Sequence, residues 1–135
     1  MTSSAIELQK AVFAALGADA GLAAALGGER IHDHAPASIG FPYITFGRTS
    51  AYDWATGTED GNEHLFTLHV WSKAKGKAET LAIMELARRA LHDKDLALEG
   101  HRLINLRAVF EEARYDEDLA VHHGLLRFRA VTEPQ

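Results

Sequence analysis

The sequence contains no cysteine and only three prolines among its 135 residues. Without cysteine the chain forms no disulfide and offers neither a thiol nucleophile nor a thiolate ligand for a metal. It also has no apolar run near the roughly 20 residues that a membrane-spanning helix needs. The opening residues, Met-Thr-Ser-Ser, lack the basic segment that begins a signal peptide. We therefore expect no membrane span and no disulfide framework, which fits assembly in the cytoplasm.

Basic residues are also fewer than acidic ones: 14 lysines and arginines against 19 aspartates and glutamates give a formal net charge of −5. A general nucleic-acid-binding protein usually has a basic patch and a high pI, so the charge disfavours a nucleic-acid-binding adaptor. The hydrophobic fraction of 47% and the charged fraction of 24% are those of an ordinary globular protein. A chain of this length buries a sizeable core without metal or disulfide. We expect one domain over residues 1–135.

The strongest pattern runs from Asn62 to His92. Residues 63–71 alternate as a strand does, with Phe66, Leu68 and Val70 on one face. Residues 77–92 follow as an amphipathic helix whose apolar stripe is Leu81, Met84, Ala87 and Leu91. A strand followed at once by such a helix builds a core, because each element buries its apolar side on the other.

The rest of the chain predicts further helices and strands of ordinary length. Ser4-Ala-Ile-Glu7 has the form of a capping box that starts the first helix. Strands joined directly by loops pair antiparallel. The expected fold class is α+β, with helices packed on one face of an antiparallel sheet of four to five strands. The expected helices span residues 4–16 and 19–26, and the expected strands span residues 30–34, 43–49, 101–110 and 119–132.

Residues that could carry out chemistry occur without a recognised spacing. Of the eight histidines, His32 and His34 share one face of a short strand, while the adjacent His122 and His123 point in opposite directions. No His-Glu-x-x-His or Gly-x-Ser-x-Gly motif occurs. The carboxylates of residues 111–118 lie in a polar turn, where water keeps their pKa values together and disfavours acid–base catalysis. We expect no catalytic residue, no cofactor-binding residue and no metal ligand, hence no enzyme.

One long polar segment indicates a contact with another protein. Residues 50–61 carry Tyr52 and Trp54 among threonine, glycine and acidic residues, and predict a mobile loop between two strands. Loops of this length inside a small domain usually have a function. Tryptophan is also enriched where protein interfaces gain most of their binding energy.

Several segments together resemble a known family. They are Phe41-Pro-Tyr43, the loop around Trp54, the strand from His64 to Trp71, Ala90-Leu-His-Asp93 and the segment from His123 to Arg129. In this order they resemble small phage and prophage proteins that are similar to tail completion (tail terminator) proteins. Such proteins occur in siphophage-like particles and in gene transfer agents. The resemblance extends from about Ile6 to Thr132.

The resemblance implies a structural assembly protein in the tail or neck of a virion-like particle, assembled in the bacterial cytoplasm. Members of the family are expected to form a homo-hexameric ring that caps the tail tube and joins it to the head connector protein. The implied partners are the tail-tube protein and the connector, with DNA passing through an acidic lumen without specific binding. Exposed sheet edges could close such a ring, with each edge meeting a different surface of its neighbour.

Within that reading, exposed residues in mobile segments are the candidate partner contacts. They are Tyr52, Asp53 and Trp54 in the long loop, Lys73, Lys75 and Lys77 in a basic turn, and Asp116, Glu117 and Asp118 in an acidic turn. Two alternatives stay open: a head–tail connector or tail-tube subunit, and a small ligand- or metal-binding α+β domain that uses His32 and His34. The residues alone fix neither the ring stoichiometry nor the side chains that line a lumen.

Overall fold

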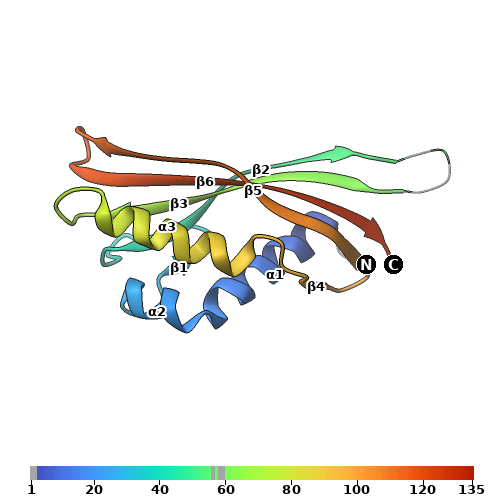
Figure 1. Cartoon of the computed structure of the whole chain (residues 1–135), viewed down its shortest axis with the longest axis horizontal. Helices are drawn as coiled ribbons and strands as arrows, with labels where there is room; N and C mark the ends of the chain where they lie inside the picture. Colours follow the sequence, from blue (N-terminus) through green and yellow to red (C-terminus); the bar gives the residue numbers. More distant parts are fainter. Residues whose placement is uncertain (1–2, 56, 58–59) are drawn as a thin grey trace.

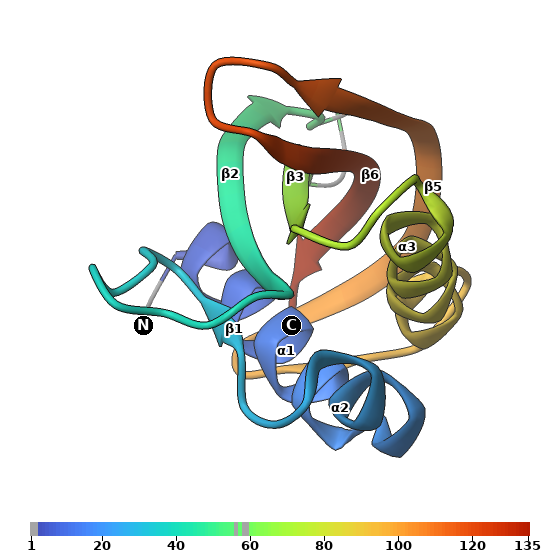
Figure 2. The same ribbon diagram turned by 90° about the vertical axis from the view of Figure 1, so that its left-hand side faces the viewer.

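A computed structural model describes residues 3–55, 57 and 60–135, and places three helices on one face of a curled sheet (Figures 1 and 2). The six strands lie in the order β1-β2-β3-β6-β5-β4. The elements are α1 (Ser4–Ala18), α2 (Ala20–Leu26), β1 (Ile31–His32), β2 (Tyr43–Asp53), β3 (Asn62–Ser72), α3 (Ala78–Leu91), β4 (Ala97–Leu98), β5 (His101–Asp116) and β6 (Val121–Pro134).

The α+β class is confirmed, but the expectation of a purely antiparallel sheet of four to five strands is wrong. The sheet has six strands, and β1 pairs parallel with β2 through Ile31 and Ile44. Between these strands, residues 33–42 return the chain to the start of β2, which is what a parallel pair requires. The short strand β4 exists because Gly100, at φ 75°, turns the chain back so that Leu98 pairs with His101.

The core lies between the helices and one face of the sheet. On that face Phe66, Leu68 and Val70 of β3 are buried as predicted, and Phe66 stacks on Phe128 of β6 with ring centroids 5.2 Å apart. The predicted inward position of Leu81 is wrong, because this side chain is 49% exposed. The stripe of α3 is rotated away from Leu81, and its buried residues are Thr80, Ile83, Met84, Ala87 and Leu91.

The N-cap of helix α1 lies one residue before the position that the sequence predicts. The side chain of Ser3, not Ser4, accepts a hydrogen bond from the backbone N–H of Ile6 at 3.2 Å. Ser4 is instead buried, and its hydroxyl accepts a hydrogen bond from the Asn62 side-chain amide at 3.2 Å. This contact ties the start of α1 to the start of β3.

Two hairpins are longer than expected, so part of each of two predicted loops is strand. β2 continues to Asp53, so Tyr52 and Asp53 are strand residues, and the expected loop over 50–61 is correspondingly shorter. Its residues 56, 58 and 59 lie outside the described residues. The acidic segment from Glu111 is likewise strand up to Asp116, and only residues 117–120 form the turn. Cross-strand pairing outweighs polar composition here, because strand preference depends strongly on neighbours.

The contact between α3 and β6 predicts the effect of a small substitution. A Cβ atom at Gly124 would lie 2.5 Å from Met84 Sδ and 2.8 Å from Thr80 Cγ2. We expect Gly124→Ala to lower the free energy of unfolding by about 1–3 kcal/mol through overpacking. Chemical denaturation of the purified protein measures the change. Gly17→Ala is the control, since nothing lies within 4 Å of that position and alanine should stabilise α1. An unchanged Gly124→Ala protein would contradict the close packing.

Candidate functional site

The candidate contact residues lie at the two opposite ends of the sheet. Tyr52, Asp53 and Trp54 are at the end of the β2–β3 hairpin, on the right in Figure 1. The turn with Lys73, Lys75 and Lys77 follows Ser72 of β3, which pairs with His122 of β6. Asp116 pairs with Val121 at the tip of the neighbouring β5–β6 hairpin, so the basic and the acidic segments share the other end. Eight of the nine candidates are exposed, and Asp116 is partly buried.

Two long strand edges have no strand partner in the described part of the chain. Beyond the short pairing with β1, residues 46–53 form one edge of the sheet. On the opposite side, β4 and the segment before it cover only the first half of β5. There the Asp93 N–H donates to Leu106 O at 2.8 Å, and the Ala108 N–H donates to His92 Nδ1 at 2.9 Å. Residues 109–116 form the second edge. Unpaired edges of this length are ready to pair with another chain.

The face of the sheet opposite the helices carries a row of stacked rings. The Trp71 ring lies flat on His123, with centroids 4.1 Å apart, and Tyr43 stacks on Trp71 at 6.3 Å. The Trp71 indole N–H donates to Thr45 Oγ1 at 3.0 Å. The Trp71 side chain packs on this uncovered face rather than in the core. The row fixes the side chains at the end of the sheet that carries the basic turn.

A histidine pair continues this row. His69 Nδ1 and His123 Nε2 are hydrogen-bonded at 2.6 Å, although the two residues are 54 positions apart. A Cβ at Gly47 would lie 2.2 Å from His69 Nε2, so only glycine leaves room for this ring on β2. Burial lowers the pKa of His69. Burial first, then the charges of His69 and Arg114, lower the pKa of His123, against weaker opposite effects of nearby carboxylates. Both imidazoles are therefore neutral at pH 7.

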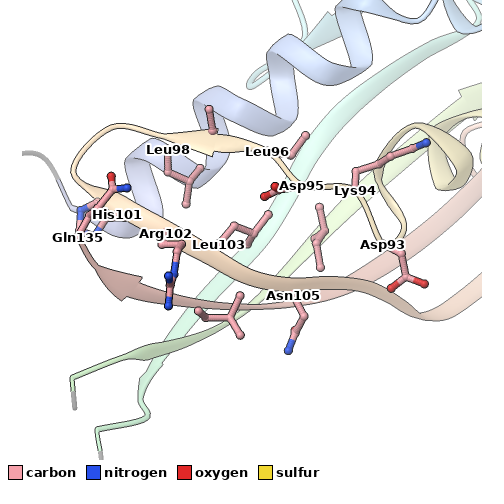
Figure 3. Close-up of a pocket in the computed structure, with 13 residues that line it drawn as sticks. Asp93, Lys94, Asp95, Leu96, Leu98, His101, Arg102, Leu103, Asn105 and Gln135 are labelled. Atoms are coloured by element: carbon pink, nitrogen blue, oxygen red, sulfur yellow. The ribbon is translucent and has the colours of Figure 1, made fainter. Parts of the chain in front are cut away.

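A hollow of about 590 Å³ lies between the segment after α3 and strand β5 (Figure 3). Asp93 and Arg102 are among its lining residues, yet their side chains are 63% and 65% exposed. The Arg102 guanidinium is engaged with the Glu133 carboxylate. A catalytic carboxyl needs an apolar pocket that separates its pKa from its neighbours. The Asp93 side chain is in contact with water, so the hollow does not give it such an environment.

The histidines considered as metal ligands are not brought together. His32 is half-buried in β1, while His34 is exposed in the segment after it. His122 points to the helix side and contacts the Tyr115 ring at 4.9 Å, and His123 joins His69 on the other face. Across the residues that the structure places, no group of three or more His, Asp or Glu could hold a metal ion.

The sequence predicts exposed sheet edges but not which strands form them, and it does not predict the His69–His123 pair. Strand alternation places His69, Trp71 and His123 on outward positions, but it does not give the register that makes them neighbours. The edges depend on how far β1 and β4 extend, which composition does not reveal. Among the described helices, none is both long and apolar enough to cross a membrane.

A one-sided sheet with two unpaired edges, an uncovered face and exposed candidate contact residues at both ends is typical of a structural protein that binds its partners through its surfaces. Residues 10–133 match the family Tail completion protein gp17, and the chain belongs to that family. Its role is structural, in the tail of a phage-like or gene transfer agent particle.

One curated relative and one solved structure agree with this assignment. The chain is 27% identical over 89 residues to "Tail completion protein gp17" of Bacillus phage SPP1, an alignment that spans 66% of each protein. It is also similar to a chain from the "Virion of native gene transfer agent (GTA) particle", with 32% identity and a TM-score of 0.88. That alignment covers 98% of this chain and 99% of the other.

The neutral histidine pair predicts a loss of stability in acid. In the unfolded chain these histidines take up protons below about pH 6.5, before the folded protein does, because folding lowers their pKa values. The free energy of unfolding should therefore fall from pH 7.5 to pH 5.5. His64 adds to the same slope, since burial, with a smaller effect of His101, lowers its pKa too.

Thermal unfolding of wild type and of His69→Gln at both pH values measures the contribution of the pair. We expect a flatter pH dependence in His69→Gln. The variant removes one histidine with a lowered pKa, and it also removes the His69 charge that lowers the pKa of His123. His34→Gln, on an exposed residue, is the matched control. A His69→Gln slope equal to that of wild type would rule out the pair as a source of acid sensitivity.

Proposed function

We propose that this protein forms a hexameric ring that caps the finished tail tube and joins it to the head connector. The observation that carries the proposal is the pair of unpaired edges, residues 46–53 of β2 and 109–116 of β5, on opposite sides of one sheet. Different surfaces that meet head to tail generate a closed ring when the rotation between copies closes.

The sheet order supports edge-to-edge closure. β2 is antiparallel to β3, β3 to β6, and β6 to β5, so β2 and β5 of one copy run in opposite directions. Rotation about a ring axis keeps each strand direction relative to that axis. The β5 edge of one copy therefore meets the β2 edge of the next as an antiparallel pair, which continues the sheet without a reversal.

The two ends of the sheet suit two different partners. A terminator must match the last tube ring on one side and the connector on the other. Tyr52, Asp53 and Trp54 form a mostly aromatic and acidic end, whereas the segments 73–77 and 116–118 form an end with dense charge of both signs. Surfaces of different chemistry at the two ends favour partners of different kinds and disfavour addition of a further identical ring.

Deletion of the gene from cells that produce the particle tests this function. We expect tails of uncontrolled length that carry no head, because nothing stops tube growth or offers the connector a surface. Electron microscopy of the released particles measures tail length and head attachment. Complete absence of tails would instead indicate a tail-tube subunit. Tails of normal length beside unjoined heads would indicate a connector, and normal head-joined particles would rule out the proposal.

Edge pairing can be tested by cross-linking, because the chain has no cysteine of its own. Ser50 of β2 and Glu112 of β5 point to the helix-free face, opposite Leu65 and Leu125 of the adjacent strands. A protein with both Ser50→Cys and Glu112→Cys, treated in assembled particles with a flexible thiol cross-linker, should give a ladder of covalent oligomers. Each single variant is the control and should give no ladder. Monomer alone from the double variant would contradict edge pairing.

A further inference from the structure

An apolar groove lies on the outer side of α1. Ile6 and Phe13 are 52% and 49% exposed, although both are large apolar side chains on one helix. Together with Phe46 and Thr49 of β2 they line a groove of about 400 Å³. Lys10 and Asp33 also line it and bring one charge of each sign. Apolar surface of this kind on a small protein indicates a contact that the isolated chain does not make.

The groove is continuous with the unpaired edge of β2, since Phe46 and Thr49 belong to both. Any strand that pairs with residues 46–53 therefore places its side chains over the groove. A strand alternates its side chains between the two faces of a sheet, so only the helix-side residues of that strand enter it.

Three residues of the β5 edge point to the helix side. Ala113 packs against the core, and the Tyr115 ring contacts His122 on the same side. Glu111 precedes Ala113 by two positions and shares this orientation. Tyr115 is 48% exposed, and Glu111 is also exposed, so both are available to another copy.

We propose that the groove is filled by the β5 edge of a second copy, with its Tyr115 against Phe13 and its Glu111 paired with Lys10. This inference rests on the ring proposed above and names the contacts that hold neighbouring copies together. The occupant is a strand of this same chain, because the groove borders the edge that the ring needs.

The spacing of the proposed contacts can be compared along the two elements. Glu111 and Tyr115 are four strand residues apart, about 13 Å. Lys10 and Phe13 are only three helix residues apart, about 4.5 Å, but the Lys10 ammonium lies 3.4 Å from the Glu7 carboxylate, six residues before Phe13 and about 9 Å from it along the axis. The long Lys10 and Tyr115 side chains span the remaining difference.

The direction of the two surfaces also agrees. α1 starts beside Asn62, which pairs with Asp53, whereas Phe13 lies beside Ile31, which pairs with Ile44. Helix α1 therefore runs opposite to β2. Since β5 of a second copy also runs opposite to β2, the order Lys10 then Phe13 follows the order Glu111 then Tyr115.

The charges select this register. The Lys10 side chain is 62% exposed and stays accessible to a second carboxylate beside its contact with Glu7 at 3.4 Å. With Glu111 at Lys10, the Tyr115 hydroxyl falls near Asp33, which accepts a hydrogen bond. A shift that brought Glu111 to Asp33 would place two carboxylates together and would be repelled.

Charge exchange tests the proposal in cells that carry the gene deletion and express one variant each. Lys10→Glu and Glu111→Lys should each lower the yield of head-joined particles about tenfold, because each places like charges at every contact of the ring. The double variant should restore the yield to within about twofold of wild type. Thermal unfolding of the purified variants checks that each folds. A double variant no better than the worse single variant would overturn the proposal.

Truncation tests the apolar half of the contact. Phe13→Ala should lower the particle yield about tenfold, as the loss of an interface aromatic does. Ile104→Ala is the matched control, since Ile104 is 43% exposed but lies outside the groove. Equal yields from both variants would contradict the groove as a contact. If deletion of the gene leaves particles normal, the proposed ring fails; if deletion is harmful and only these variants behave as wild type, the groove contact alone fails.

Discussion

The pairing of β3 with β6 is the interaction on which the rest of the structure depends. Residues 62–72 pair with residues 122–132 without a break, and these two strands form the centre of the sheet. Their helix-side residues, among them Phe66 and Phe128, fill the core. Helix α3 lies directly against Gly124 of β6. Because the central pair is long and regular, the outer strands β2 and β5 are held at full length, and they extend past the helices at both ends (Figure 1).

A chain of this size has enough apolar surface to cover one face of such a sheet. The three helices cover one face of the sheet, and the short strands β1 and β4 cover only part of each edge. What is left over is an uncovered face, two edges and two projecting ends. In a protein that acted alone these would invite aggregation. In the ring proposed above they are the surfaces through which each copy meets its neighbours.

Side chains on the uncovered face are fixed in place although no helix covers them. The stacked row from Tyr43 through Trp71 to His123, together with Gly47 beneath His69, holds that end of the sheet rigid. A rigid surface loses little conformational entropy when a partner binds, so affinity comes at lower cost. The groove beside α1 is apolar and shaped by the same strand β2. Both features place the proposed binding surfaces on regular elements rather than on loops.

The sequence by itself determined the α+β class, the buried face of β3, and the absence of a recognised catalytic motif. These follow from local periodicity, because alternation and helical spacing depend only on nearby residues. Leu81 and Ser4 were misplaced, since helix rotation and capping depend on what the helix meets. The edges, the His69–His123 pair and the groove at Phe13 were decided by tertiary structure alone. Each joins residues far apart in the chain, and only strand register and packing bring such residues into contact.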